Sequence, residues 1–119
     1  MDRLCKKSAS ELARLVRSKE ASSKEIVEAH FNRIKEVNPG INAITVTLEE
    51  SALKLADEAD SASEEDRKRP FHGVPFTIKE NIDFMGTPTT NGIPLLAESM
   101  PPRNAVSYTH LTLPTILLV

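Results

Sequence analysis

The chain has 119 residues, of which 39% are hydrophobic and 27% charged, and its formal net charge is −2. This composition is typical of a folded globular protein and excludes a disordered chain, and the acidic net charge argues against a nucleic-acid partner, which requires concentrated basic residues. The single cysteine, Cys5, excludes an internal disulfide. Because no apolar run is long enough for a signal peptide or a membrane span, we expect a cytoplasmic protein with no membrane partner.

Two similar helix starts open the chain. Ser8 with Glu11, and Ser22 with Glu25, have the spacing of a capping box, in which each side chain satisfies the other residue's backbone N–H. Apolar residues then recur on one face after each start, which predicts a short and a longer amphipathic helix. The second helix should end before Asn38-Pro39-Gly40, because proline restricts the residue before it and glycine favours a helix end.

A strand, a third helix and a loop are predicted next. Residues 41–47 are rich in Ile, Val and Thr, which favours a strand. Residues 48–62 return to a helical pattern, with Ala52, Leu55, Ala56 and Ala59 on the buried side. The mixed charges of residues 61–70 indicate a solvated loop.

The most informative stretch ends at a lysine. A turn at Gly73 leads into a short β-branched and aromatic run that stops at Lys79, and a second turn-rich segment follows at residues 86–92. This pattern predicts an amine at the end of a buried strand, facing a loop. A buried lysine is costly to keep charged, so Lys79 is a candidate general base. From the residues alone, Glu80 could instead pair with Lys79 on the surface and keep it charged.

The strings HGVPFTIKENI, at residues 72–82, and GTPTTNG, at residues 86–92, closely resemble the lysine segment of the amidase signature family. The likeness runs from about Ser8 to about Ala105. It implies a Ser-cisSer-Lys triad in which the lysine matching Lys79 acts on the proton of a bridging serine. The resemblance also implies hydrolysis of a carboxamide C–N bond in a small-molecule amide through a serine acyl-enzyme, with no cofactor. The two serines belong to a glycine- and serine-rich segment further along the family's sequence, which this chain lacks.

The order helix, helix, strand, helix, loop, strand predicts an α/β fold. With the resemblance, it implies the N-terminal helices and first strands of the amidase signature fold, a mixed central sheet covered by helices, in truncated form. Two short strands give three helices too little sheet to cover. We therefore interpret residues 1–105 as the N-terminal part of an amidase signature domain.

Residues 106–119 break with the pattern before them. Val106 to Thr115 match one reading frame of a common transposase-type sequencing adapter, so we interpret residues 106–119 as translated adapter sequence rather than native protein. We expect them to lack consistent packing and give Tyr108 and His110 no functional role. A genuine apolar C-terminal strand is the alternative.

Two functions of different classes follow from the sequence. The first is part of an amidase with Lys79 as general base, and we expect the fragment alone to be inactive. A component of a transamidase that forms glutaminyl-tRNA belongs to the same family. The second is a small non-catalytic interaction module that retains part of the amidase scaffold. His30, and His72 with Glu80 or Asp83, have no partner spacing that indicates a catalytic base or a metal site.

Overall fold

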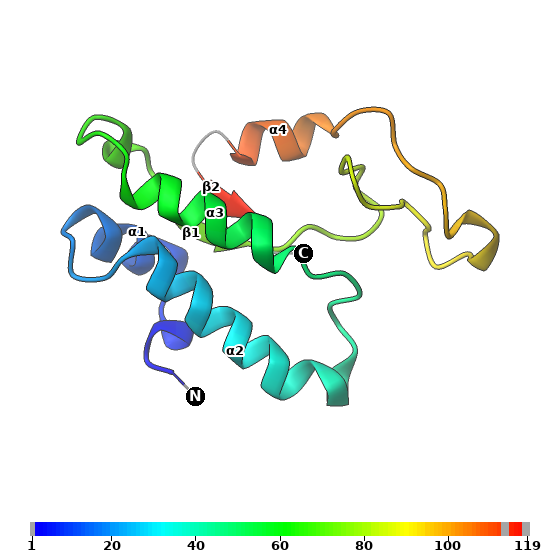
Figure 1. Ribbon diagram of the computed structural model, residues 1–119, viewed down its shortest axis with the longest axis horizontal. Helices are drawn as coiled ribbons and strands as arrows, with labels where there is room; N and C mark the ends of the chain where they lie inside the picture. The colour runs from blue at the N-terminus through cyan, green and yellow to red at the C-terminus, as the bar shows by residue number, and fades with distance from the viewer. Residues whose placement is uncertain (1, 113–114, 118–119) are drawn as a thin grey trace.

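The computed structural model describes residues 2–112 and 115–117 of the chain (Figure 1). Among these residues the helices are α1 (Ala9–Arg17), α2 (Ser23–Ile41), α3 (Glu49–Asp60) and α4 (Val106–Thr112), and the strands are β1 (Val74–Phe76) and β2 (Thr115–Leu117). Short 3₁₀ turns form at Leu4–Lys6, Asp66–Lys68 and Pro94–Leu96. Helices and a little strand thus share one fold, as the predicted α/β class requires.

Both predicted capping boxes are confirmed. In the first, the Ser8 N–H donates to Glu11 Oε2 at 2.8 Å, and the Glu11 N–H donates to Ser8 Oγ at 3.3 Å. In the second, the Ser22 N–H donates to Glu25 Oε2 at 2.7 Å, and the Glu25 N–H donates to Ser22 Oγ at 3.0 Å. Hydrogen bonds that each glutamate carboxylate accepts, first from the serine backbone and then from the serine side chain, lower the pKa of both glutamates below the ordinary value.

The predicted end of α2 is wrong, because the helix continues through Pro39 to Ile41. It stops at Asn42, whose left-handed backbone (φ 52°) lets its N–H donate to the Asn38 carbonyl. The Asn38 side chain holds the chain beyond the helix: its Oδ1 accepts from the N–H groups of Ala43 and Ile44, at 3.0 and 2.9 Å. An asparagine at the helix end thus supplies the stop that we had assigned to proline and glycine.

The strand predicted at residues 41–47 is also wrong. Ile41 belongs to α2, and residues 42–48 form an irregular connection. The backbone groups of Ala43 and Ile44 are satisfied by Asn38, and no strand among the described residues pairs with them. β-Branched composition alone does not make a strand without a neighbouring strand to complete the hydrogen bonds.

The third helix is confirmed and runs back alongside α2 (Figure 1). Between the two helices lies a buried cluster of Val27, Phe31, Ala52, Ala56 and Ala59. The assignment of Leu55 to the buried side is wrong, since it is 39% exposed. Leu53 packs against the cluster instead, so the three alanines let α3 lie close to α2.

A second buried cluster joins α1 and the start of α2 to β1. Its members are Leu12, Ala13, Leu15, Val16, Ile26 and Val74. A polar contact reinforces it, because the fully buried Ser23 donates from its hydroxyl to the Gly73 carbonyl at 2.7 Å. The contact fixes where β1 begins relative to α2, and thereby where the segment after β1 starts.

The strand predicted to reach Lys79 is shorter than expected. β1 ends at Phe76 because its only partner in the described part of the chain is β2, which pairs with it in parallel from Val74 opposite Thr115 to Phe76 opposite Leu117. The 3₁₀ turn at Asp66–Lys68 lies in the predicted charged loop, residues 61–70, where no longer helix or strand forms.

The segment interpreted as translated adapter makes contacts with the rest of the chain where it is described. Val106–Thr112 forms α4, and the Tyr108 ring meets Phe84 edge-on with centroids 4.8 Å apart. Residues 106, 107, 109 and 110 are exposed, and β2 pairs with β1 over three residues, so the expectation that the segment lacks consistent packing stays a prediction. Residues 113–114 and 118–119 lie outside the described part. The origin of this segment stays a prediction.

In the described residues, no helix combines the length and apolar character needed to cross a bilayer.

Candidate functional site

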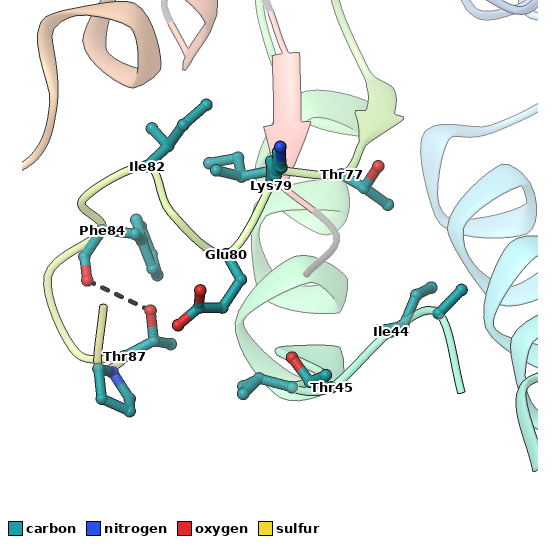
Figure 2. Close-up of a pocket in the computed structure, with 12 residues that line it drawn as sticks. Ile44, Thr45, Thr77, Lys79, Glu80, Ile82, Phe84 and Thr87 are labelled. Atoms are coloured by element: carbon teal, nitrogen blue, oxygen red, sulfur yellow. Dashed lines mark hydrogen bonds between the residues drawn. The ribbon is translucent and has the colours of Figure 1, made fainter. Parts of the chain in front are cut away.

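A cavity of about 610 Å³ lies between the connection after α2 and the segment after β1 (Figure 2). Apolar side chains dominate its walls, and its polar groups are threonines, one lysine and one glutamate. The lining residues are Ala43, Ile44, Thr45, Val46, Thr77, Ile78, Lys79, Glu80, Ile82, Phe84, Thr87 and Pro88. The largest apolar members, such as Ile78, Ile82 and Phe84, are half-buried, so the cavity opens to solvent.

Lys79, the predicted base, lies on the wall of this cavity but not at the end of a strand. It follows the irregular residues Thr77 and Ile78, and its side chain is exposed rather than buried in this chain. Its backbone is held by a turn, in which the Ile82 N–H donates to the Lys79 carbonyl at 2.9 Å. Lys79 therefore lines the cavity, but the predicted burial of its side chain is not achieved by these residues.

The surface ion pair between Lys79 and Glu80, which the residues alone left open, does not form in the described chain. Figure 2 shows the two side chains leaving the backbone on different sides, with the Glu80 carboxylate directed towards Thr87. That carboxylate accepts from the backbone N–H of Thr90 through Oε1 and from that of Asn91 through Oε2, the latter at 3.0 Å. Hydrogen bonding by the Thr90 side chain, then by the Thr90 and Asn91 backbone, lowers the pKa of Glu80.

Asp83 provides a second anchor for the same loop. The Thr89 hydroxyl donates to Asp83 Oδ1 at 2.7 Å, and the Asp83 carbonyl accepts from the Ala105 N–H at 2.8 Å. Two acidic residues that follow Lys79 therefore hold three consecutive residues of the loop, 89–91. The segment containing Lys79 and the threonine-rich segment form one hydrogen-bonded unit.

The threonine-rich loop makes its turn at Asn91 and Gly92. Both have positive φ, 52° and 72°, and the Ile93 N–H donates to the Thr90 carbonyl at 2.9 Å, as in a type I′ turn. The Thr90 hydroxyl accepts from the Gly92 N–H at 3.1 Å, and the Thr87 hydroxyl donates to the Phe84 carbonyl at 3.3 Å. Thr89 and Thr90 are therefore used inside the loop, and Thr87 also lines the cavity.

Neither histidine is close to this chemistry. His30 Nδ1 lies 2.7 Å from the Ile26 carbonyl on its own helix, and His72 Nε2 lies 2.9 Å from the Ala59 carbonyl of α3. Within residues 2–112 and 115–117, no group of three or more metal-ligating side chains that could hold an ion comes together. His72 contacts α3, whereas Glu80 and Asp83 contact the loop at residues 89–91.

The cavity can contribute an amine for proton transfer and apolar walls for an uncharged group. The residues that line it include no serine or cysteine, so it offers no hydroxyl or thiol nucleophile apart from threonines. Sequence reasoning missed Glu80 and Asp83 as anchors. Their partners lie 10 and 11 residues away for Glu80 and 6 away for Asp83, which is too far for any local turn pattern to indicate.

A model of the amidase family matches residues 25–114 of the chain. An indoleacetamide hydrolase from Bradyrhizobium diazoefficiens is 42% identical over 99 residues, which are 82% of this chain and 19% of that protein. A glutamyl-tRNA(Gln) amidotransferase subunit from Thermoanaerobacter pseudethanolicus is 37% identical over 95 residues, 80% of this chain and 20% of that protein.

Among solved structures, a fatty acid amide hydrolase superposes with a TM-score of 0.89 at 26% identity, over 98% of this chain and 21% of that one. The likeness to this enzyme confirms the predicted α/β fold, because it covers nearly the whole of this chain. The chain spans about a fifth of the length of the relatives that it matches.

Proposed function

This chain belongs to the amidase signature family, and we propose that it is the N-terminal part of a serine amidase in which Lys79 is the general base. The observation that carries the proposal is the position of Lys79 on the wall of the cavity, within the segment that bears the family resemblance. The similarity to an indoleacetamide hydrolase and to a fatty acid amide hydrolase supports amide hydrolysis as the reaction.

In the proposed reaction, the bridging serine takes the proton of the nucleophilic serine and gives its own hydroxyl proton to the Lys79 amine. The nucleophile then forms an ester with the acyl group, the amine product leaves with a proton, and water hydrolyses the ester. Both serines come from parts of the protein outside this chain. Those parts would also cover Lys79, because the exposed side chain and the open cavity leave its surroundings incomplete here.

The test uses the full-length protein and a chromogenic carboxamide. Lys79→Ala should lower kcat by roughly 100- to 10,000-fold, the usual contribution of a general base, with no loss of fold. Lys79→Arg should be nearly as damaging, because a guanidinium keeps its proton. Lys54→Ala, an exposed lysine on α3, is the matched control and should retain wild-type turnover. A Lys79→Arg enzyme with wild-type turnover would exclude Lys79 as the base.

A component of an amidotransferase is the second candidate, favoured by the 37% identity to the glutamyl-tRNA(Gln) amidotransferase protein of Thermoanaerobacter pseudethanolicus. The same lysine chemistry on glutamine would release ammonia for a partner enzyme. Turnover of glutamine that rises when partner proteins are added would support this candidate. Efficient hydrolysis of simple carboxamides by the protein alone would support the free amidase.

We also propose that residues 106–119 are translated adapter sequence. The family match includes residues 106–114, so the segment needs a direct test. Sequencing the source DNA beyond the Ala105 codon decides the question. A sequence that continues in frame after the Ala105 codon into a glycine- and serine-rich segment is expected, whereas recovery of the codons for residues 106–119 would establish them as native.

A further inference from the structure

The carboxylate of Glu80 occupies an unusual position, because it faces away from its cationic neighbour (Figure 2) and accepts hydrogen bonds from the loop at Thr90 and Asn91 instead. Its two oxygens accept from the Thr90 and Asn91 N–H groups, one each. A carboxylate that bridges two consecutive N–H groups fixes both the distance and the orientation of the peptide that bears them. Glu80 therefore ties the type I′ turn of the loop to the segment that contains Lys79.

The turn that contains Glu80 also contains Lys79. The Ile82 N–H donates to the Lys79 carbonyl, so residues 79–82 form one turn with Glu80 at its second position. Any rotation of the Glu80 backbone that releases the loop must change the direction of the adjoining Lys79 peptide. The Asp83–Thr89 bond restrains the other end of this turn against the same loop.

We propose that Glu80 is a positioning residue for Lys79, acting by clamping the Thr90–Asn91 backbone against the turn from which the lysine side chain leaves. This inference rests on the proposed role of Lys79. It predicts that Glu80 acts on turnover rather than on substrate binding, because it acts through the geometry of the base. Glu80 does line the cavity, but its oxygens are occupied by the loop.

The test compares Glu80→Gln, Glu80→Asp and Glu98→Gln in the full-length enzyme. Glutamine keeps one acceptor and presents an NH₂ group to the second N–H, so it breaks the clamp at nearly constant size. Aspartate keeps both oxygens on a side chain that is one methylene shorter, so it should restore function only in part. Glu98 is an exposed glutamate near the same loop, with no hydrogen bond or ion pair in the described structure, so Glu98→Gln makes the same change of charge without touching the clamp.

We expect Glu80→Gln to lower kcat about ten- to a hundredfold with KM near the wild-type value, as small misplacements of a catalytic group can do. Glu80→Asp should recover part of the loss, and Glu98→Gln should match the wild type. Equal kcat for Glu80→Gln and Glu98→Gln would overturn the inference. If instead Lys79→Ala is as active as the wild type, the proposed function fails, which is a separate outcome.

Hydrogen–deuterium exchange of the peptide that spans residues 87–93 gives a second measurement, which does not depend on activity. The Thr90 and Asn91 amides should exchange slowly in the wild type and in Glu98→Gln, and faster in Glu80→Gln. If Glu80→Gln does not fold, exchange in the wild type still tests the inference. Fast exchange of the Thr90 and Asn91 amides in the wild type would contradict the proposed hydrogen bonds to Glu80.

Discussion

The hydroxyl of Ser23 donates a 2.7 Å hydrogen bond to the backbone carbonyl of Gly73, 50 residues further along the chain. Ser23 is fully buried at the first position of α2, and its own N–H donates to Asp60 at the end of α3. One residue thus connects α2, α3 and the entry to β1. The contact sets the point from which the chain runs on to Lys79.

We expect Ser23→Ala to lower the free energy of unfolding by roughly 1–3 kcal/mol, because it leaves the Gly73 carbonyl buried without this partner. Urea denaturation monitored by circular dichroism measures the change. Ser10→Ala, at an exposed site on α1, is the control and should be neutral or slightly stabilising, since alanine has the higher helix propensity. An equal effect of the two substitutions would contradict the buried hydrogen bond.

Gly73 should resist replacement for two reasons. Its φ of +74° is unfavourable for any side chain, and a Cβ there would lie 3.1 Å from Ser23 Cβ, Ser23 Oγ and Val16 Cγ1. Gly73→Ala should therefore cost about 1–3 kcal/mol of stability. Gly40→Ala is the matched substitution: no atom lies within 4 Å of its added Cβ, and alanine in helix α2 should add about 0.5–1 kcal/mol. Urea denaturation measures both changes in the free energy of unfolding, and a stabilising Gly73→Ala would refute the argument.

The capping boxes make a prediction about titration. Because the pKa values of Glu11 and Glu25 are lowered on folding, their contribution to stability is present above the ordinary value of 4.5 and is lost as pH falls through the lowered values. Ser22→Ala removes one of the bonds to Glu25 and should move its pKa back towards 4.5. Glu11 serves as the internal control and should keep its pKa. Carbon-13 NMR titration of the glutamate carboxyls measures both, and an unchanged Glu25 would argue against the box.

The features that sequence predicted well are those set by neighbouring residues. The Ser-x-x-Glu spacing placed the starts of α1 and α2, and the alanine periodicity identified the buried side of α3. Errors arose where a distant or unexpected partner decides the structure. Asn38 moved the end of α2 and prevented a strand after it, and the short partner β2 ended β1 at Phe76.

The candidate site divides in the same way. The pattern ending in Lys79 singled out a residue that lines the cavity, because the motif is contiguous. The clamp by Glu80 on Thr90 and Asn91 was not predictable, since it joins residues across a loop whose course depends on the fold. Leu55 shows the same limit in the core, because the periodicity assigned it to the buried side, whereas Leu53 packs against the cluster and Leu55 is exposed.

The chain of residues 1–119 should hydrolyse no carboxamide, because a base without its nucleophile cannot form the acyl-enzyme. Incubation of the purified chain with a chromogenic amide should match the buffer blank, and labelling with a fluorophosphonate serine reagent should be no greater than after heat denaturation. The full-length protein, labelled at the nucleophilic serine, is the positive control. Hydrolysis by the 119-residue chain that the serine reagent abolishes would contradict the proposed location of the nucleophile outside it.

The two histidines provide the sharpest test of whether another residue takes the proton. His30 and His72 each place a ring nitrogen against a backbone carbonyl, of Ile26 and Ala59, and neither lines the cavity. In the full-length enzyme, His30→Ala and His72→Ala should therefore keep turnover close to wild type and leave the acidic limb of its pH profile in place. His72→Ala should lower the thermal midpoint, since it loses the contact with α3. Loss of the acidic limb in either folded variant, with Lys79→Arg still active, would identify that histidine as the base instead of Lys79.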